Sequence, residues 1–304
     1  MPKYAFFEGQ FVPIGQAKVS VMTHGLNYGT GCFEGIRAYW NEDHQQLYVF
    51  RLKEHFDRMH LSARILFIEL PQSAEELSET TLELLRLEDY RHDAYIRPLA
   101  FKCDEVIGVR LHGLCDAFTM FAVPFGRYVE NEEGCRVCIS PWRRIDDNAA
   151  PARAKITGAY INSALAKSCA VMGGFDEALV LTASGHISEG SAENFFMVRH
   201  GKLITPPVTS NILEGITRAT IMQLARDEMG VETVEREIDR SEVFVADEAF
   251  FTGTGVQVAA IIEAEYRKVG TGSIGPLTEQ LRDLYFKVVR GEVEKYRHWC
   301  TPVY

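Results

Sequence analysis

The 304-residue sequence has no apolar run approaching the ~20 residues that cross a membrane, and its first residues lack the apolar segment of a secretory signal. It has no basic stripe, and a net charge of −10 argues against a nucleic-acid surface. The motifs of a P-loop, of a dinucleotide-binding βαβ unit and of a G-x-S-x-G hydrolase are all absent. We therefore expect neither a nucleic acid nor a membrane as a partner.

Metal ligands with useful spacing are also lacking. The seven cysteines are odd in number and scattered, which favours a reducing cytoplasm over a disulfide framework. Cys135 and Cys138 form the one close pair, but no second pair accompanies them, and three residues apart on a strand they face opposite sides. His55 and His60 lie five apart on an expected helix and so face differently. We expect no metal site.

The composition, 46% hydrophobic and 24% charged, is that of a globular protein with material for two domains. A polar, glycine-containing stretch after an apolar strand predicts domains at 1–126 and 135–304, joined by a linker at 127–134. Hydrophobic periodicity predicts a mixed α/β chain. Expected strands lie at 6–12 (a hairpin), 17–21, 47–50, 94–101, 117–123, 135–140, 177–182 and 195–198, and expected helices at 53–66, 73–87, about 162–172, before 229, and at 277–289.

Lys155 stands at a junction between a loop and a helix, among very small residues. Ala152, Ala154, Gly158 and Ala159 leave room for a bulky group beside its amine. A lysine in a crowded apolar site can form a Schiff base. The alternative is an ordinary solvated lysine, so the rest of the chain must decide.

Other parts of the second half offer complementary chemistry. Glu189 lies on a small-residue loop that leads into an apolar strand, where a buried carboxylate needs a partner. The stretch 215–217, Gly-Ile-Thr, opens a helix and provides free N–H groups that suit a phosphate, although simple capping by Thr217 is an equal alternative. A second turn at 253–255 offers further N–H donors. Together these features match the needs of pyridoxal 5'-phosphate (PLP): an amine, an acid for the ring nitrogen and an anion site.

The first half adds Arg51 at a strand end and Arg97 beside Tyr95 on one strand face, where a carboxylate is the natural partner. Seven segments then carry a resemblance to a known family, in family order over nearly the whole chain. They are HGLNYGTGCFEGIRAY (24–39), YVFRLKEH (48–55), AYIRPL (94–99), ARAKITGAY (152–160), ISEGSAENFF (187–196), ILEGITR (212–218) and FFTGTG (250–255). In these segments the chain resembles a fold-type IV PLP enzyme, of the kind typified by D-amino acid aminotransferase, and most of all the branched-chain amino acid aminotransferases.

The resemblance implies a role for each matching position. Lys155 would form the Schiff base with PLP and move the proton, and Glu189 would pair with the pyridinium nitrogen. The other cofactor-binding positions would be Arg51, Tyr160, Leu213, Gly215, Ile216, Thr217, Gly253 and Thr254. The substrate-binding positions would be Tyr28, Phe33, Tyr95, Arg97, Val109, Phe125, Tyr128, Thr254 and Gly255, with Tyr28 and Val109 supplied by a neighbouring subunit and Arg97 taking the γ-carboxylate of glutamate.

The implied activity is transfer of an amino group between L-leucine, L-isoleucine or L-valine and 2-oxoglutarate by a ping-pong mechanism. The implied fold has two α/β domains with the cofactor at their interface, in a homodimer or higher homo-oligomer. Phe125, Gly255, Gln257 and the added cation Arg110 depart from the common pattern and leave the substrate range open. The alternatives are a D-amino acid or (R)-amine transaminase, an aminodeoxychorismate-type lyase, or a non-catalytic binding protein on the same scaffold.

Overall fold

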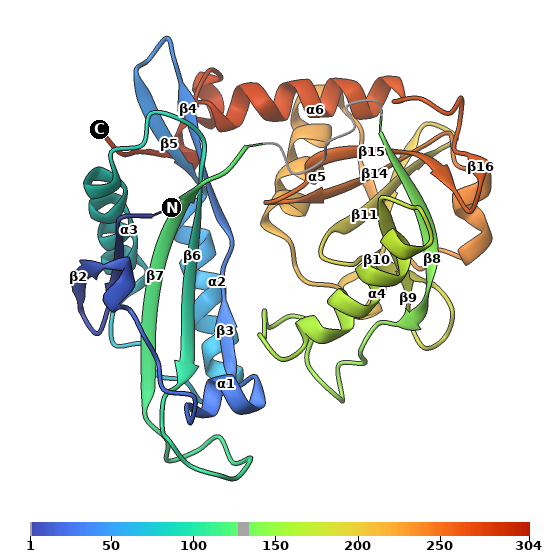
Figure 1. Ribbon diagram of the computed structural model, residues 1–304. Helices are drawn as coiled ribbons and strands as arrows, with labels where there is room; N and C mark the ends of the chain where they lie inside the picture. Colours follow the sequence, from blue (N-terminus) through green and yellow to red (C-terminus); the bar gives the residue numbers. More distant parts are fainter. Residues whose placement is uncertain (1, 127–133) are drawn as a thin grey trace. The chain divides into compact units, whose positions relative to one another are not determined.

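The computed structural model describes residues 2–126 and 134–304, which form two compact units (Figure 1). The first unit runs to Gly126 and also contains Ala154–Gly158 and Lys287–Tyr304. The second contains residues 134–153 and Ala159–Phe286. The sequence predicts two continuous stretches, 1–126 and 135–304. The structure instead assigns two later pieces of chain, one of them carrying Lys155, to the first unit.

The first unit is built on an antiparallel sheet whose strands follow the order β17-β5-β4-β6-β7-β1-β2, with β3 also paired to β6. Helices α2 and α3 pack together and contact strands of this sheet. Ser73 and Glu76 form a capping box at the start of α3. The elements are β1 (Tyr4–Phe7), β2 (Gln10–Pro13), α1 (His24–Tyr28), β3 (Gly31–Phe33), β4 (Ile36–Asn41), β5 (Gln46–Phe50), α2 (Leu52–Ile65), α3 (Ala74–Glu88), β6 (Ala94–Lys102), β7 (Asp116–Pro124) and β17 (Cys300–Pro302).

The second unit contains a mixed sheet of strand order β10-β9-β8-β15-β14-β11-β12-β13, with β16 paired to β15. Strand β8 runs parallel to both β9 and β15, and α4 packs against β8 and β9. Helix α5 packs against β14. The elements are β8 (Cys135–Arg143), α4 (Tyr160–Met172), β9 (Glu177–Leu181), β10 (Ile187–Gly190), β11 (Asn194–Arg199), β12 (Lys202–Thr205), α5 (Ile216–Met229), β13 (Thr233–Glu235), β14 (Glu248–Gly253), β15 (Gln257–Ala264), β16 (Arg267–Lys268) and α6 (Pro276–Val289).

The mixed α/β class predicted from periodicity is confirmed, and the predicted helices match α2 to α6 closely. The strand expected at 17–21 was wrong. Residues 17–20 have no regular secondary structure, and Val19 and Val21 are exposed by 50% and 81%. Alternation of apolar and polar residues favours a strand only where a neighbouring strand accepts the ladder hydrogen bonds, and none in the described part of the chain pairs with this segment.

Residues 154–158, which include Lys155, bind the rest of the first unit through backbone contacts. Ile156 forms a β-bridge with Cys32, and the Phe33 N–H donates to the Lys155 carbonyl at 3.1 Å. A Cβ on Gly29, whose φ is +67°, would lie 2.6 Å from the Cα of Gly158. Gly29 therefore has no room for a side chain, and a Cβ on Gly158 would lie 3.1 Å from the Gly29 carbonyl oxygen, so the two backbones are in close contact.

No helix in residues 2–126 and 134–304 combines the length and apolar character that a membrane crossing requires. Over the same two ranges, no three His, Cys, Asp or Glu side chains gather in a way that could hold a metal ion.

Candidate active site

Lys155 is half-buried in the loop that precedes α4. It lies in the Ala154–Gly158 segment, which belongs to the first unit. Its backbone N–H donates to Ser62 Oγ of α2 at 3.1 Å. Its Nζ lies 5.1 Å from the centroid of the Phe33 ring. The amine is thus held against an apolar aromatic face by a backbone that is fixed on both sides, by β3 and by α2.

Arg97 approaches the same Phe33 ring. Its guanidinium carbon lies 4.4 Å from the ring centroid, and its Nη2 donates to the hydroxyl of Tyr95 at 2.8 Å. Phe125 packs against the Tyr95 ring at a centroid distance of 5.1 Å. Gly35 completes the arrangement, because a Cβ there would meet the Tyr95 hydroxyl at 2.3 Å. Four predicted site residues, Phe33, Tyr95, Arg97 and Phe125, are therefore neighbours of Lys155 or of one another.

Arg51 adopts the left-handed conformation, with φ of 49°, immediately before α2. Such a backbone is uncommon for a residue with a side chain and often marks a functional position. The Arg51 guanidinium lies 4.0 Å from the Trp299 ring centroid, and Nη1 is 3.5 Å from Glu54. The cation is mostly buried and directed by these two contacts.

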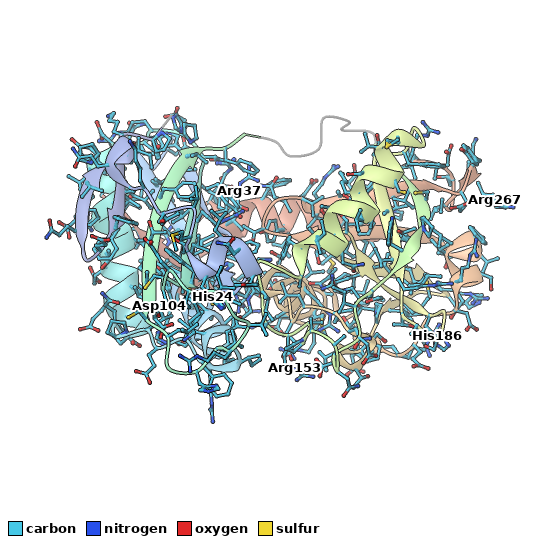
Figure 2. All side chains as sticks on the ribbon, turned by 60° about the horizontal axis from the view of Figure 1, so that its bottom comes forward. His24, Arg37, Asp104, Arg153, His186 and Arg267 are labelled. Carbon is cyan, nitrogen blue, oxygen red and sulfur yellow. The ribbon has the colours of Figure 1, made fainter. Side chains whose placement is uncertain are left out.

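Tyr28 and the loop at Gly108 are held by His24, which is fully buried in α1 (Figure 2). His24 Nε2 donates to the Gly108 carbonyl at 2.7 Å, and Nδ1 lies 2.7 Å from Thr30 Oγ1. The Gly108 N–H in turn donates to the Tyr28 hydroxyl at 3.1 Å. Tyr28 and Val109 are thus close in the chain's own fold, and Val109 is 77% exposed.

In the second unit, Glu189 of β10 is 3% exposed and surrounded by donors. Arg144 Nη2 is 2.8 Å from its Oε1, and Asn194 Nδ2 donates to its Oε2 at 3.0 Å. The Leu213 N–H donates to the same Oε2 at 3.2 Å. An arginine and two neutral donors stabilise the charged form of a buried carboxylate, which can then accept a further hydrogen bond from a cationic N–H.

Asn194 ties this carboxylate to the start of α5. Its Nδ2 also donates to the Leu213 carbonyl at 2.9 Å, and a Cβ on Gly215 would meet its Oδ1 at 1.9 Å. Only glycine therefore fits as the residue before α5, and a glycine has no side chain to cap the helix. The first N–H groups of α5 and the buried Thr217 hydroxyl therefore have the donors that an anion requires.

Four further predicted residues lie in this unit. Gly253 is the last residue of β14 and pairs with Gln257, and Thr254 and Gly255 lie in the turn between β14 and β15. The Thr252 hydroxyl just before this turn is buried and has no hydrogen-bond partner among the described residues. Tyr160 is the first residue of α4.

The structure therefore gathers the predicted residues into two groups, one in each unit. The first contains Lys155, Arg51, Phe33, Tyr95, Arg97, Phe125, Tyr28 and Val109, and the second contains Glu189, Leu213, Gly215, Ile216, Thr217, Gly253, Thr254, Gly255 and Tyr160. Tyr128 lies outside the described residues. Arg110 is exposed. The second group fits PLP: Glu189 suits a protonated ring nitrogen, and the start of α5 suits a phosphate.

Two residues of the second unit that contact Glu189, Arg144 and Asn194, were not predicted from the sequence. Arg144 sits in a polar run that reads as a surface loop, and only its contact with a carboxylate distant in sequence reveals its role. Asn194 follows Glu193 at the start of an apolar strand. A buried amide side chain needs hydrogen-bond partners, and this need was the one sequence signal that pointed to Asn194.

The chain is similar to several known proteins over nearly its whole length. The family described as amino-transferase class IV matches residues 31–264. The probable branched-chain-amino-acid aminotransferase of Aquifex aeolicus (strain VF5) is 49% identical over 301 residues, which are 99% of this chain and 97% of that protein. The crystal structure of the branched-chain aminotransferase of the archaeon Thermoproteus uzoniensis with norvaline has a TM-score of 0.96 and 43% identity, covering 100% of both chains. That of the branched-chain amino acid aminotransferase of Thermobaculum terrenum in its PLP-form has a TM-score of 0.95 and 38% identity, covering 100% of this chain and 99% of that one.

A second buried carboxylate, Glu193, lies in the turn after Glu189. Burial, together with the nearby Glu177, raises the pKa of Glu193 from 4.5 to about 8, although the Ala192 N–H that donates to it acts in the opposite direction. Glu177 is paired with Lys167 at 2.7 Å. The folded protein thus keeps a proton on Glu193 that the unfolded chain releases at lower pH.

We predict that this proton makes the fold less stable as pH rises from 4.5 to about 8, because the folded state then binds more protons than the unfolded state. Glu193→Gln, which is always neutral, should lose less thermal stability over that interval than the parent protein. The measurement is the melting temperature against pH, with exposed Glu292→Gln as a control that removes the same formal charge. Parallel curves for parent and Glu193→Gln would contradict the protonated Glu193.

Proposed function

The chain belongs to the amino-transferase class IV family, within the branched-chain amino acid aminotransferases, and from this premise we propose that it moves the amino group between L-leucine, L-isoleucine or L-valine and 2-oxoglutarate. Its fold is that of the fold-type IV PLP enzymes. The single observation that supports this substrate pair best is the sharing of one aromatic ring, Phe33, by the amine of Lys155 and the guanidinium of Arg97.

The cofactor is PLP, which when bound supplies an aldehyde that reacts with amines and a ring that withdraws electrons from the α-carbon. We propose that Glu189 accepts a hydrogen bond from the ring nitrogen. Arg144 keeps that carboxylate charged, so the proton stays on the ring. Within the second unit, the first N–H groups of α5 and the Thr217 hydroxyl bind the phosphate. The cation of Arg51 in the first unit has the chemistry of a further phosphate ligand.

The remaining cofactor contacts rest on the family resemblance. Tyr160 binds the ring hydroxyl from the start of α4, and Leu213, whose backbone contacts both Glu189 and Asn194, packs on a ring face. Gly253 and Thr254 extend the phosphate site from the turn after β14. Lys155 supplies the amine to which the cofactor is attached, and its Nζ takes the proton from the substrate α-carbon and later returns it.

The substrate pocket must accept both an apolar side chain and the γ-carboxylate of glutamate. Phe33, Phe125 and Tyr95 supply apolar surface, and Arg97 supplies a cation, held between Phe33 and the Tyr95 hydroxyl. The Tyr95 hydroxyl binds the α-carboxylate, and the N–H groups of the turn at Thr254 and Gly255 in the second unit have the chemistry of further carboxylate donors. The two substrates use one pocket in turn, so a ping-pong order follows.

We also propose a homo-oligomer with a dimer as its smallest unit. Four exposed apolar side chains, Val21, Leu26, Ile107 and Val109, lie on segments that His24 and Tyr28 fasten together. An apolar patch of this kind marks an interface, and a second copy of the chain would cover it and receive Tyr28 and Val109 into its pocket. The seven cysteines are all free, which suits the reducing cytoplasm as the location.

The function is tested by a substrate panel. With 2-oxoglutarate as acceptor, we expect turnover of L-leucine, L-isoleucine and L-valine and little turnover of D-alanine or an (R)-amine. The purified protein should be yellow, and Lys155→Ala should bind PLP without transaminating. Activity with D-alanine or the (R)-amine alone would replace this proposal by the corresponding transaminase, and a colourless protein that takes up no PLP would favour a binding role.

A second prediction concerns Arg97. Arg97→Met keeps the apolar stem and loses the charge, so the KM for L-glutamate should rise by about 10–100-fold, as expected for loss of a hydrogen-bonded ion pair. The kcat/KM for L-leucine should change by less than about 3-fold, since apolar chains need only the rings. Exposed Arg64→Met, on α2 of the same unit, is the matched control. An equal loss for both substrates would mean that Arg97 is not the γ-carboxylate ligand.

The third prediction concerns assembly. Sedimentation equilibrium of the parent protein should give a mass of at least a dimer, and the double change Ile107→Glu and Val109→Glu should weaken association by introducing charges into the patch. Leu61→Glu, at a side chain 61% exposed on α2 of the same unit, is the control. A monomeric parent protein, or equal dissociation in patch and control variants, would remove the patch from the interface.

A further inference from the structure

A buried ion cluster in the first unit has no part in the binding roles above. Glu34 is fully buried in the link between β3 and β4. Arg58 Nε donates to its Oε1 at 2.8 Å and Arg58 Nη2 to its Oε2 at 2.7 Å, a two-pronged ion pair. His55 Nδ1 donates to the same Oε2 at 2.8 Å. Three donor atoms thus fix a single carboxylate in place.

The charge state of the cluster follows from these contacts. Burial alone raises the pKa of Glu34, but the charge of Arg58 and the hydrogen bonds from His55 and Arg58 outweigh it and hold that pKa far below its ordinary value. Burial lowers the pKa of His55, and the positive charges of Arg58 and Lys155 lower it further, against the opposing effect of Glu34. The cluster is therefore an ionised Glu34–Arg58 pair with a neutral imidazole as the third donor.

The residues on either side of Glu34 touch the proposed site. Phe33 donates its backbone N–H to the Lys155 carbonyl at 3.1 Å and offers its ring to both Lys155 and Arg97. Gly35 lies against the Tyr95 hydroxyl. The backbone N–H of Glu34 itself donates to the Pro98 carbonyl at 3.0 Å, next to Arg97. A short segment of three residues thus contacts the amine-bearing residue and both proposed carboxylate ligands.

Helix α2 contacts both this segment and the Lys155 backbone. His55, Arg58 and Ser62 recur at helical spacing and share one face of α2. His55 and Arg58 bind Glu34, and Ser62 Oγ accepts the N–H of Lys155 at 3.1 Å. One rigid helix therefore fixes both the segment that carries Phe33 and the backbone that carries Lys155.

We infer that Glu34, Arg58 and His55 are positioning residues, which hold Phe33 so that the Lys155 amine and the Arg97 guanidinium keep their places against its ring. This inference rests on the proposed aminotransferase function. None of the three side chains is assigned contact with substrate or cofactor, and their effect acts through Phe33 and Lys155. A misplacement of about 1 Å in such a site can reduce the rate by about 100-fold.

The test compares variants of the full-length protein loaded with PLP. The double change Glu34→Gln and Arg58→Gln removes both charges and so leaves no unpaired buried ion. His55→Asn keeps a donor near the Nδ1 position. The matched control is Glu88→Gln, because Glu88 is 2% exposed, accepts the N–H groups of Lys3 and Tyr4 at 2.7 Å, and belongs to the same unit.

We expect the double variant to lose about 10–100-fold in kcat with L-leucine, and Glu88→Gln and His55→Asn to stay within about 3-fold of the parent. Two readouts are independent of turnover. Amide hydrogen exchange at Phe33 and Lys155 should accelerate in the double variant only. After removal and readdition of PLP, its cofactor absorbance band should also return about 10-fold more slowly than that of the control.

The outcomes distinguish a failure of the positioning role from a failure of the proposed function. A double variant that matches Glu88→Gln in kcat, in exchange at Phe33 and in recovery of the band, at equal loss of thermal stability, would overturn the positioning role and leave the proposed function intact. A parent protein that takes up no PLP or does not transaminate L-leucine would overturn the proposed function and this inference together.

Discussion

The attachment of the Lys155 stretch to β3 is the constraint on which the group of candidate residues in the first unit depends. Lys155 lies in a loop, and loops alone position side chains poorly. Here the loop is continued by a β-bridge between Ile156 and Cys32 and by contact between the backbones of Gly158 and Gly29. The Lys155 N–H is taken by Ser62. The backbone of Lys155 is therefore fixed by a sheet and by a helix, although Lys155 itself lies in neither.

The second unit solves a different problem, which is to keep a carboxylate charged while it is buried. Glu189 has one arginine and two neutral donors, and Asn194 serves as one of these donors while its amide oxygen lies against Gly215. The same side chain thus sets the distance between an acid and the start of α5. The residue before α5 is a glycine, which has no side chain. The first N–H groups of α5 therefore have no capping side chain and are available to a ligand.

Much of this could be predicted from the sequence, because the signals are local. Helical periodicity, the Ser73 capping box and the residue types at Lys155, Glu189 and 215–217 need no knowledge of distant contacts. The contribution of Lys155–Gly158 to the first unit could not be predicted, since it depends on pairing with β3, far away in sequence. The roles of Arg144 and Asn194 were missed for the same reason. The prediction of a strand at 17–21 was wrong because alternation of apolar and polar residues cannot reveal whether a neighbouring strand exists.

The contacts of Arg97 explain how a guanidinium can lie among aromatic side chains. A guanidinium in such a place needs partners that leave its charge unneutralised. The ring face of Phe33 and the Tyr95 hydroxyl are such partners, because neither is an anion. In the proposed function, Arg97 therefore binds a carboxylate while the rings contact a branched aliphatic chain. A protein carboxylate beside Arg97 would have neutralised it. The acid of this region, Glu34, is instead bound to Arg58 and His55 on α2, where it fixes the ring without competing for Arg97.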